Sequence, residues 1–178
     1  MSKQKIIILA LVSCVLLLAA PLSISYKQRH SMSVAPSFTV GDASLPRHVL
    51  IATQGSTFKD ALVNGIVSYL KPRGAYVNVI DVSALPSIHE DEWTAMVVIH
   101  TWEFGKPQHD AMAFVERLQD KSKLIDVTTS GSGQQVISGI DAISAASVMR
   151  DEPGPLGAVT ARLDALLQVG TADGTNPH

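Results

Sequence analysis

A glycine flanked by hydroxyl-bearing residues is the first candidate for ligand binding. The sequence Thr53-Gln54-Gly55-Ser56-Thr57 follows a short apolar run and precedes a helical pattern. Free backbone N–H groups and the positive end of a helix can hold a phosphate there, and Ser and Thr hydroxyls add donors. The spacing is neither that of a Walker loop nor that of a GxGxxG dinucleotide loop. The same residues also suit an ordinary helix cap with a glycine turn, so both interpretations stay open.

Two aromatic residues stand together in a second loop, whose sequence is HTWEFGKP. This loop contains Thr101, Trp102, Phe104 and Gly105. Aromatic residues make up only 5% of the chain, so two of them at one loop tip suggest a stacking surface for a flat ring. The alternative is that Trp102 anchors the loop to the core.

Other chemistries lack the residues they need. The single cysteine, Cys14, excludes a disulfide within the chain and a Cys-based zinc or iron–sulfur site. The six histidines show no metal-binding spacing such as HExxH, and no serine lies in a GxSxG elbow. The sequence therefore supports neither a metal site nor hydrolysis.

Strand and helix patterns alternate from residue 48 onward. Apolar residues run through 48–53, recur at three- and four-residue intervals over 58–70, and alternate over 75–82. Further strands are predicted at 94–101, at 122–129 and within 139–148, and further helices around 111–118 and after residue 153. This order predicts a three-layer α/β domain with an open parallel sheet. Such sheets bind ligands beyond the carboxyl ends of their strands, where loops 54–57, 101–108 and 130–135 are expected.

The chain resembles the flavodoxin family over residues 48–168. The family's phosphate loop has the pattern [ST]-x-[ST]-G-x-[ST], which the stretch ATQGST matches at Gly55 and Thr57 but not at Ala52 and Gln54. The aromatic loop and a glycine-rich loop lie in the places expected of the family. The resemblance implies a flavodoxin-like fold with strand order 2-1-3-4-5, a non-covalent FMN cofactor, and electron transfer or reduction of a quinone-type partner.

The resemblance also implies which residues touch the flavin. Residues 53–57 would hold the phosphate, and Trp102 with its loop would cover the ring. The third loop would bring backbone amides to the pyrimidine edge of the flavin. Its residues are Ser130, Gly131, Ser132 and Gly133.

A stretch at 139–147 offers an alternative mode of FMN binding. The sequence GIDAISAAS is similar to the D-x-x-[ST]-[GA]-A-[TS] motif at which extracytoplasmic flavoproteins carry FMN as a phosphoester. Ser147 would be the attachment point. Ala145 and Ser147 depart from the residues usual in the motif. A covalent FMN carrier therefore stays open beside the non-covalent site.

The N-terminus predicts a membrane segment. Residues 6–26 are uncharged and long enough, at 21 residues, to span a hydrocarbon core of about 30 Å. The segment could instead be a cleaved signal peptide, or a lipobox ending at Cys14. We expect a segment at 1–26, a tether at 27–46, a flavodoxin-like domain at 47–168 and a disordered tail at 169–178. The domain would then lie on the extracytoplasmic side, at the inner membrane facing the periplasm or at the cell surface.

Charge restricts the partners of the domain. After residue 30 the chain holds 10 of its 14 Lys and Arg residues and all 16 Asp and Glu residues, a net charge near −6. This balance argues against a nucleic-acid surface and suits docking to a basic redox protein. A domain of the same fold that binds no flavin and serves as a binding or scaffold module in the envelope remains an alternative, because fold does not determine function.

Overall fold

A mixed sheet of seven strands is the centre of the fold. The computed structural model describes residues 4, 32–103, 105–140 and 142–172. Five parallel strands form the body of the sheet: β2 (Arg47–Thr53), β3 (Ala75–Asp81), β4 (Ala95–Glu103), β6 (Leu124–Ser130) and β7 (Ala142–Ala146). Among themselves they lie in the order β3-β2-β4-β6-β7, which is a 2-1-3-4-5 arrangement.

Two short strands make the sheet mixed, so the prediction of a purely parallel sheet of five strands is wrong. Strand β1 (Phe38–Val40) pairs antiparallel with β3 at one edge, and β5 (Lys106–Pro107) pairs antiparallel with β4 as a hairpin. The complete strand order therefore differs from the predicted one. Strand β1 lies within the predicted tether at 27–46. It covers the backbone of β3 that would otherwise be an unpaired edge, and this part of the segment therefore belongs to the folded unit.

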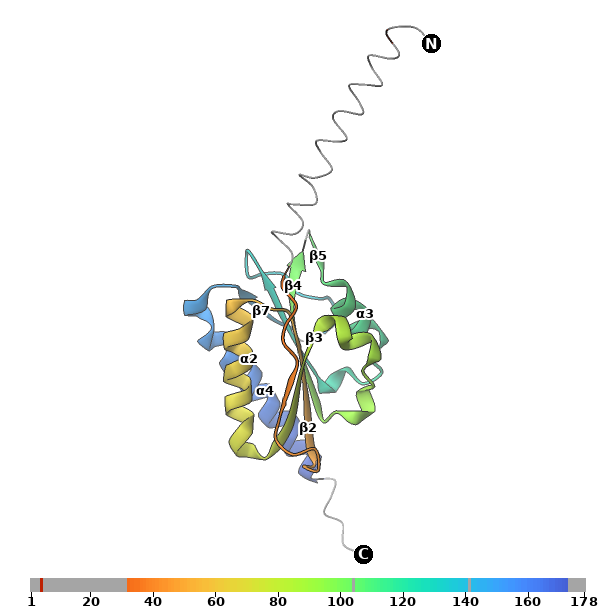
Figure 1. The fold of residues 1–178 in the computed structure, drawn as a ribbon, viewed down its shortest axis with the longest axis vertical. Coiled ribbons are helices and arrows are strands. Elements are labelled where there is room, and N and C mark those ends of the chain that lie inside the picture. The colour runs from red at the N-terminus through yellow and green to blue at the C-terminus, as the bar shows by residue number, and fades with distance from the viewer. Residues whose placement is uncertain (1–3, 5–31, 104, 141, 173–178) are drawn as a thin grey trace, which may run out of the picture. The chain divides into compact units, whose positions relative to one another are not determined.

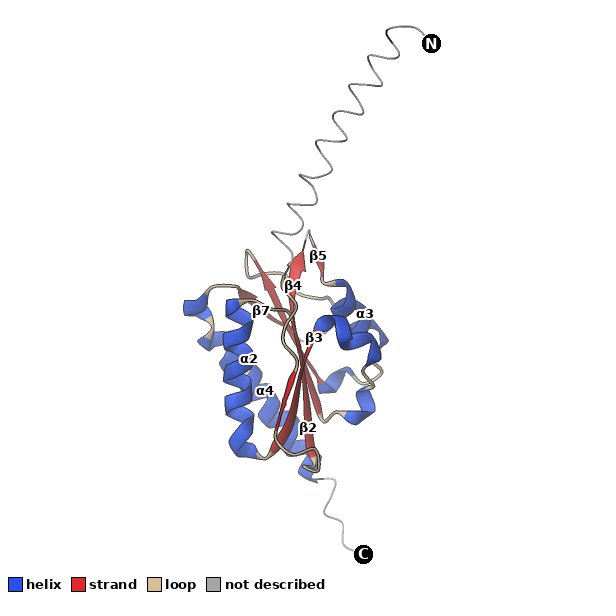
Figure 2. Cartoon of the chain, in the orientation of Figure 1, coloured by secondary structure: helices blue, strands red, loops and turns tan. Residues whose placement is uncertain are grey.

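Helices cover both faces of the sheet. On one face lie α2 (Thr57–Leu70) and α4 (Pro153–Ala172), and on the other lies α3 (His109–Arg117) (Figure 1). Coloured by secondary structure, the sheet separates the two helical layers, as predicted (Figure 2). Short 3-10 helices fill the connections: η1 (Lys71–Arg73), η2 (Val82–Ser87), η3 (Glu90–Glu92), η4 (Lys121–Lys123) and η5 (Met149–Asp151). Helix α4 extends to Ala172, past the predicted start of the tail.

The two faces of the sheet bury separate cores because side chains alternate along each strand. In β2, Val49 and Ile51 point to the α2–α4 layer, whereas Leu50 and Ala52 point to the α3 layer. All four are fully buried. A central strand with two apolar faces is typical of a parallel sheet covered by helices on both sides.

No helix within the described residues is long and apolar enough to cross a membrane. The predicted span at 6–26 lies outside those residues, as do Phe104 and the predicted tail from 173 onward.

We predict that Gly41→Ala destabilises the protein by about 2 kcal/mol or more. Gly41 has φ 90°, and a Cβ there would lie 2.5 Å from the carbonyl oxygen of Ala75, so both conformation and space oppose a side chain. Gly157→Ala is the matched control, because Gly157 lies in α4 and a Cβ there would meet nothing within 4 Å. It should stabilise the protein by about 1 kcal/mol. Urea unfolding measures both, and equal stabilities would contradict the close approach of residue 41 to β3.

Candidate functional site

The predicted loops do meet at the carboxyl edge of the sheet. Strands β2, β4 and β6 run parallel, so the loops after Thr53, Glu103 and Ser130 begin at the same edge. The strand order reverses at β2, whose neighbours β3 and β4 lie on its opposite sides. A reversal of this kind is the usual ligand crevice of an open α/β sheet.

The Gly55 turn leads directly into α2. The Ser56 side chain accepts a hydrogen bond from the Lys59 backbone N–H at 3.3 Å, so Ser56 is the N-cap of the helix. Thr57 is the first helical residue and is exposed. The N-cap interpretation is thus confirmed, while the role of this turn as a phosphate site stays a prediction.

A segment from before the first strand lies on the Gly55 turn. The Gly55 N–H donates to the carbonyl oxygen of Ser33 at 2.7 Å, and the Ser33 hydroxyl donates to the Gly55 carbonyl oxygen at 2.9 Å. A Cβ on Gly55 would overlap the Ser33 Oγ. Glycine is therefore required here for close packing against Ser33, and its backbone donor is already used within the chain.

Lys59 is a candidate functional residue that the sequence motifs did not single out. Its side chain is fully buried, and its Nζ donates to the Thr101 Oγ1 at 2.5 Å. Thr101 Oγ1 lies 3.1 Å from Thr129 Oγ1, and these two residues are register partners on β4 and β6. The Sδ of Met32 lies 3.3 Å from the same Nζ. The Lys59 amine thus lies at the carboxyl edge of the sheet. It contacts one side chain from β4 and one from the segment before β1, and a hydroxyl on β6 lies one hydrogen bond further away.

Burial changes the proton affinity of this amine. Loss of water lowers the pKa of Lys59 from its ordinary value of 10.5 to about 8, and the smaller effects of the Glu103 and Asp60 carboxylates act in the opposite direction.

The sequence pattern could have indicated that Lys59 is buried. Lys59 occurs three, four and seven residues before Leu62, Val63 and Ile66, which places a charge on the apolar face of α2.

Gln54 faces the protein instead of a ligand. Its Oε1 accepts from the Thr101 backbone N–H at 2.8 Å, and its Nε2 donates to Glu103 at 3.1 Å. Gln54 therefore joins the end of β2 to the end of β4, a distance that a short hydroxyl side chain could not reach. The neighbouring Thr53 is also buried, and its hydroxyl donates to the Gln54 carbonyl oxygen.

The second loop continues β4 as a hairpin with β5. Trp102 pairs in register with Pro107, and its partly buried ring packs against the core on the α3 side. This packing agrees with the anchoring interpretation of Trp102. Gly105 is exposed with φ 77°, as the turn of the hairpin requires. The stacking of an aromatic ring from this loop on a flavin stays a prediction.

The third loop closes on itself. The hydroxyl of the buried Ser130 accepts from the Gly133 N–H at 3.0 Å and lies 3.4 Å from the Ser132 hydroxyl. Gly133 has φ 65° and packs on β7, where a Cβ would lie 2.7 Å from the Ala146 nitrogen. Gly131 and Ser132 are both exposed. Ser147, the predicted attachment point, is exposed just after β7.

A buried polar cluster lies one row below this edge, on the α3 face. His100 and Asp126 are both fully buried, with the Nε2 of the ring 3.2 Å from Oδ1 of the carboxyl group. These two atoms are misaligned for a hydrogen bond, and the aligned partner of both side chains is the Thr128 hydroxyl, at 3.2 Å from His100 and 3.0 Å from Asp126. The cluster ties β4 to β6 beneath the loops.

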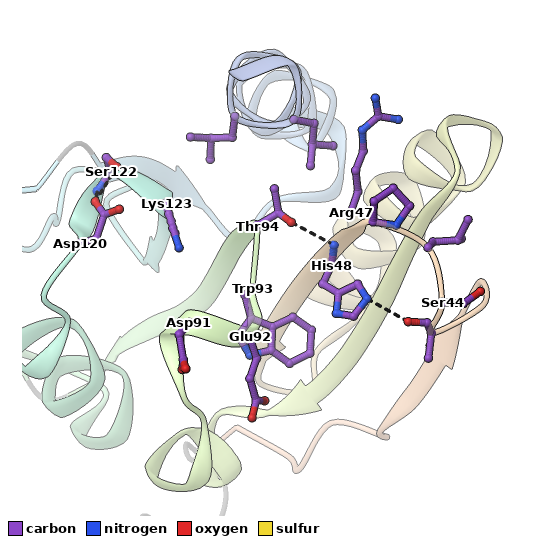
Figure 3. A pocket seen from close by; sticks show the side chains of 15 residues that line it. Ser44, Arg47, His48, Asp91, Glu92, Trp93, Thr94, Asp120, Ser122 and Lys123 are labelled. Carbon is purple, nitrogen blue, oxygen red and sulfur yellow. Dashed lines mark hydrogen bonds between the residues drawn. The ribbon is translucent and has the colours of Figure 1, made fainter. Parts of the chain in front are cut away.

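A large hollow lies at the opposite, amino edge of the sheet (Figure 3). It has a volume of about 980 Å³, and its wall includes His48, Trp93 and Lys123. The His48 backbone N–H donates to the Thr94 hydroxyl at 3.1 Å, which joins the first residues of β2 to the start of β4 (Figure 3). The sequence did not predict this hollow. No group of acidic, His or Cys side chains within the described part of the chain could hold a metal ion.

We predict that Lys59 makes stability rise with pH above about 8. Between pH 8 and 10.5 the unfolded chain keeps a proton on this amine that the folded protein has released, so folding gains up to about 3 kcal/mol through that window. Urea unfolding from pH 7 to 10.5 should show this rise in the wild type relative to Lys59→Met. Lys71→Met, at an exposed position, is the control and should follow the wild type. If the unfolding free energies of Lys59→Met and the wild type changed with pH in the same way, the lowered pKa of Lys59 would be contradicted.

We also predict that the buried cluster is energetically coupled. His100→Leu and Asp126→Leu should each cost about 1–3 kcal/mol, because each removes one of the two side-chain partners of the buried Thr128 hydroxyl, through which the two side chains are connected. The double variant should cost less than the sum of the two losses. Urea unfolding of the four proteins measures the coupling, and simple additivity would show that the two side chains do not interact.

Comparisons with known proteins agree with the fold. No protein-family model matches the chain, and no curated protein sequence matches it. The metal-soaked flavodiiron core of Flv1 from Synechocystis sp. PCC6803 matches with a TM-score of 0.54 at 14% identity, over 71% of this chain and 37% of that one. An oxidoreductase from Corynebacterium diphtheriae matches with a TM-score of 0.44 at 15% identity, over 69% of this chain and 97% of that one. A flavodoxin from Streptococcus pneumoniae TIGR4 matches with a TM-score of 0.43 at 13% identity, over 66% and 97%. This chain thus spans little more than a third of the flavodiiron core, and its likeness to that core supports a flavodoxin-like fold.

Proposed function

We propose that this protein binds FMN at the carboxyl edge of its sheet and takes part in electron transfer or in the reduction of a quinone-type partner. The observation that carries the proposal is the position of the Gly55 turn. It leaves the central strand β2 at the point where the strand order reverses, and it opens α2 with its backbone N–H groups toward the edge.

The residues at this edge fit a phosphate group in kind. Ser56 and Thr57 carry hydroxyls at the start of α2, and the ammonium of Lys59 lies in the first turn of the same helix. The Gly55 N–H would be the central donor, but it is paired with Ser33 and has to exchange that partner for the phosphate. FMN, when bound, supplies the electron-carrying chemistry, and these residues would bind and orient it.

Location and partners extend the proposal. An uncharged segment at 6–26 would anchor the domain on the extracytoplasmic side of a membrane. The acidic balance of the domain would favour a redox partner with a basic surface. Fractionation of cells that express the full chain would test the anchor, since a membrane-spanning protein stays in the membrane fraction after a carbonate wash.

Two observations favour a second candidate, a binding module that takes no flavin. Ser33 uses both backbone hydrogen-bonding groups of Gly55, and Trp102 packs against the core on the α3 side. If both arrangements are permanent, the edge has neither a free phosphate donor at Gly55 nor a stacking plate at Trp102. A covalent FMN carrier through the exposed Ser147 is the third candidate.

A spectrum of the purified full chain before and after acid precipitation tests the three candidates. We expect yellow colour released into the supernatant, and FMN binding that Thr57→Ala weakens about tenfold, because a hydroxyl bonded to a charged group contributes about 1.5 kcal/mol or more. Trp102→Ala should also weaken binding, whereas Ser147→Ala should leave it unchanged.

The other outcomes assign the other candidates. Yellow colour retained in the pellet and lost in Ser147→Ala would identify a covalent carrier. A colourless folded protein that takes up no added FMN would contradict the flavin proposal and support the binding module.

A further inference from the structure

Residues 32–35, which we call the strap, lie against the candidate site and present acceptors to its donors. The Ser33 carbonyl oxygen accepts from the Gly55 N–H at 2.7 Å. The Met32 Sδ lies 3.3 Å from the Lys59 Nζ. Two donors of the site are therefore matched by two acceptors from consecutive residues of the same chain.

The partners of Lys59 are weak for a buried ammonium group. Its Nζ contacts a threonine hydroxyl and a thioether sulfur, and sulfur is a poor acceptor. Glu103 and Asp60 influence the amine from a distance, but neither forms an ion pair with it within the described part of the chain. A buried cation without a paired anion is costly. An oxyanion in the place of the sulfur would be a much stronger partner.

We infer that the strap occupies the place of an anionic ligand, and that a phosphate group and the strap compete for the Gly55 N–H and the Lys59 ammonium. The inference deepens the proposed function and rests on it, because the phosphate of FMN is the proposed ligand. It adds a cation, Lys59, to the site and an intramolecular competitor that regulates access.

The strap is held by few contacts. Ser33 and Gly55 form an isolated bridge, not a ladder, and Val34 is 78% exposed. A further anchor is the buried N–H of Ala35, which donates to Asp81 Oδ2 at 2.7 Å. Beyond the strap, β1 stays paired with β3, so a released strap remains close and can return. The open state therefore requires the loss of only a few contacts.

Asp81 offers a variant that releases the strap with a closely matched control. Asp81 Oδ1 accepts from the backbone N–H of Ser83 at 2.9 Å, and Asp120 Oδ1 accepts from that of Ser122 at 3.0 Å, each at the start of a 3-10 helix. Of these two carboxylates, Asp81 also holds the strap. Asp81→Ala should open it, whereas Asp120→Ala removes an equivalent cap without touching it. Met32→Glu places a carboxylate next to the Lys59 amine and should hold the strap in its closed position.

Accessibility of Lys59 reports the position of the strap in the full-length protein. We would follow reductive methylation of Lys59 with formaldehyde and borane by peptide mass spectrometry, with the exposed Lys71 as internal reference. Methylation should be several-fold faster in Asp81→Ala than in the wild type or Asp120→Ala, and slower in Met32→Glu. Inorganic phosphate should protect Lys59 in Asp81→Ala. If the wild-type strap is open a tenth of the time, Asp81→Ala should bind phosphate and FMN about tenfold more tightly than the wild type does.

The outcomes separate this inference from the proposed function. If phosphate protects Lys59 on strap release but FMN does not bind, the strap inference stands and the flavin proposal fails. If FMN binds equally to all four proteins, the flavin proposal stands and the strap inference is overturned. Equal methylation in all four proteins, or faster methylation that phosphate does not suppress, also overturns it. Should Asp81→Ala fail to fold, Met32→Glu decides alone, since it must slow methylation and weaken phosphate binding.

Discussion

The backbone of β2 is paired on both sides, with β3 and with β4, and the rest of the molecule is arranged around this pairing. Both partners are parallel to it, so the chain has to cross over the sheet twice to reach them. Helix α2 makes the first crossing and covers one face. The double pairing also brings the last residues of three parallel strands to one edge. Polar side chains that would be scattered in the sequence are therefore gathered there.

The gathered side chains mainly serve each other. Gln54 links the ends of β2 and β4, and the Thr101 and Thr129 hydroxyls continue across to β6. Lys59 extends this network from α2. Within a low-dielectric interior such groups are stable only when each finds a partner. The weakest of these pairings, between the ammonium of Lys59 and the sulfur of Met32, is the place where another molecule could improve on the protein's own contacts.

The flavodoxin-like fold and the flavin chemistry have different support. The fold follows from the strand order, the three layers and the match to a flavodiiron core. The chemistry depends on whether the Gly55 turn and Lys59 become available to a ligand, because the turn is occupied by Ser33 in this arrangement. The same contacts that complicate a flavin site give the protein a means of controlling it.

The sequence by itself determined the α/β class and the positions of the three edge loops, because both follow from the apolar periodicity of successive segments and from the right-handed crossover between parallel strands. The order of the five parallel strands among themselves was implied by the resemblance to flavodoxins. The edge strands β1 and β5 were missed because strands of three and two residues have no period to detect. The interpretation of Ser56 as a helix N-cap was correct, because capping depends on the residue itself and its immediate neighbours.

Only the tertiary structure decided how the candidate site is filled. The contacts of Ser33 with Gly55 join residues 22 positions apart, and that of Lys59 with Thr101 joins residues 42 positions apart. Periodicity could have shown that Lys59 lies on the apolar face of its helix, but not what its amine meets there. Such partners are set by the packing of three segments at one sheet edge, and no local pattern records that packing. The sequence therefore predicted which loops could bind a ligand, and only the folded chain placed its own Met32 and Ser33 against Lys59 and the Gly55 turn.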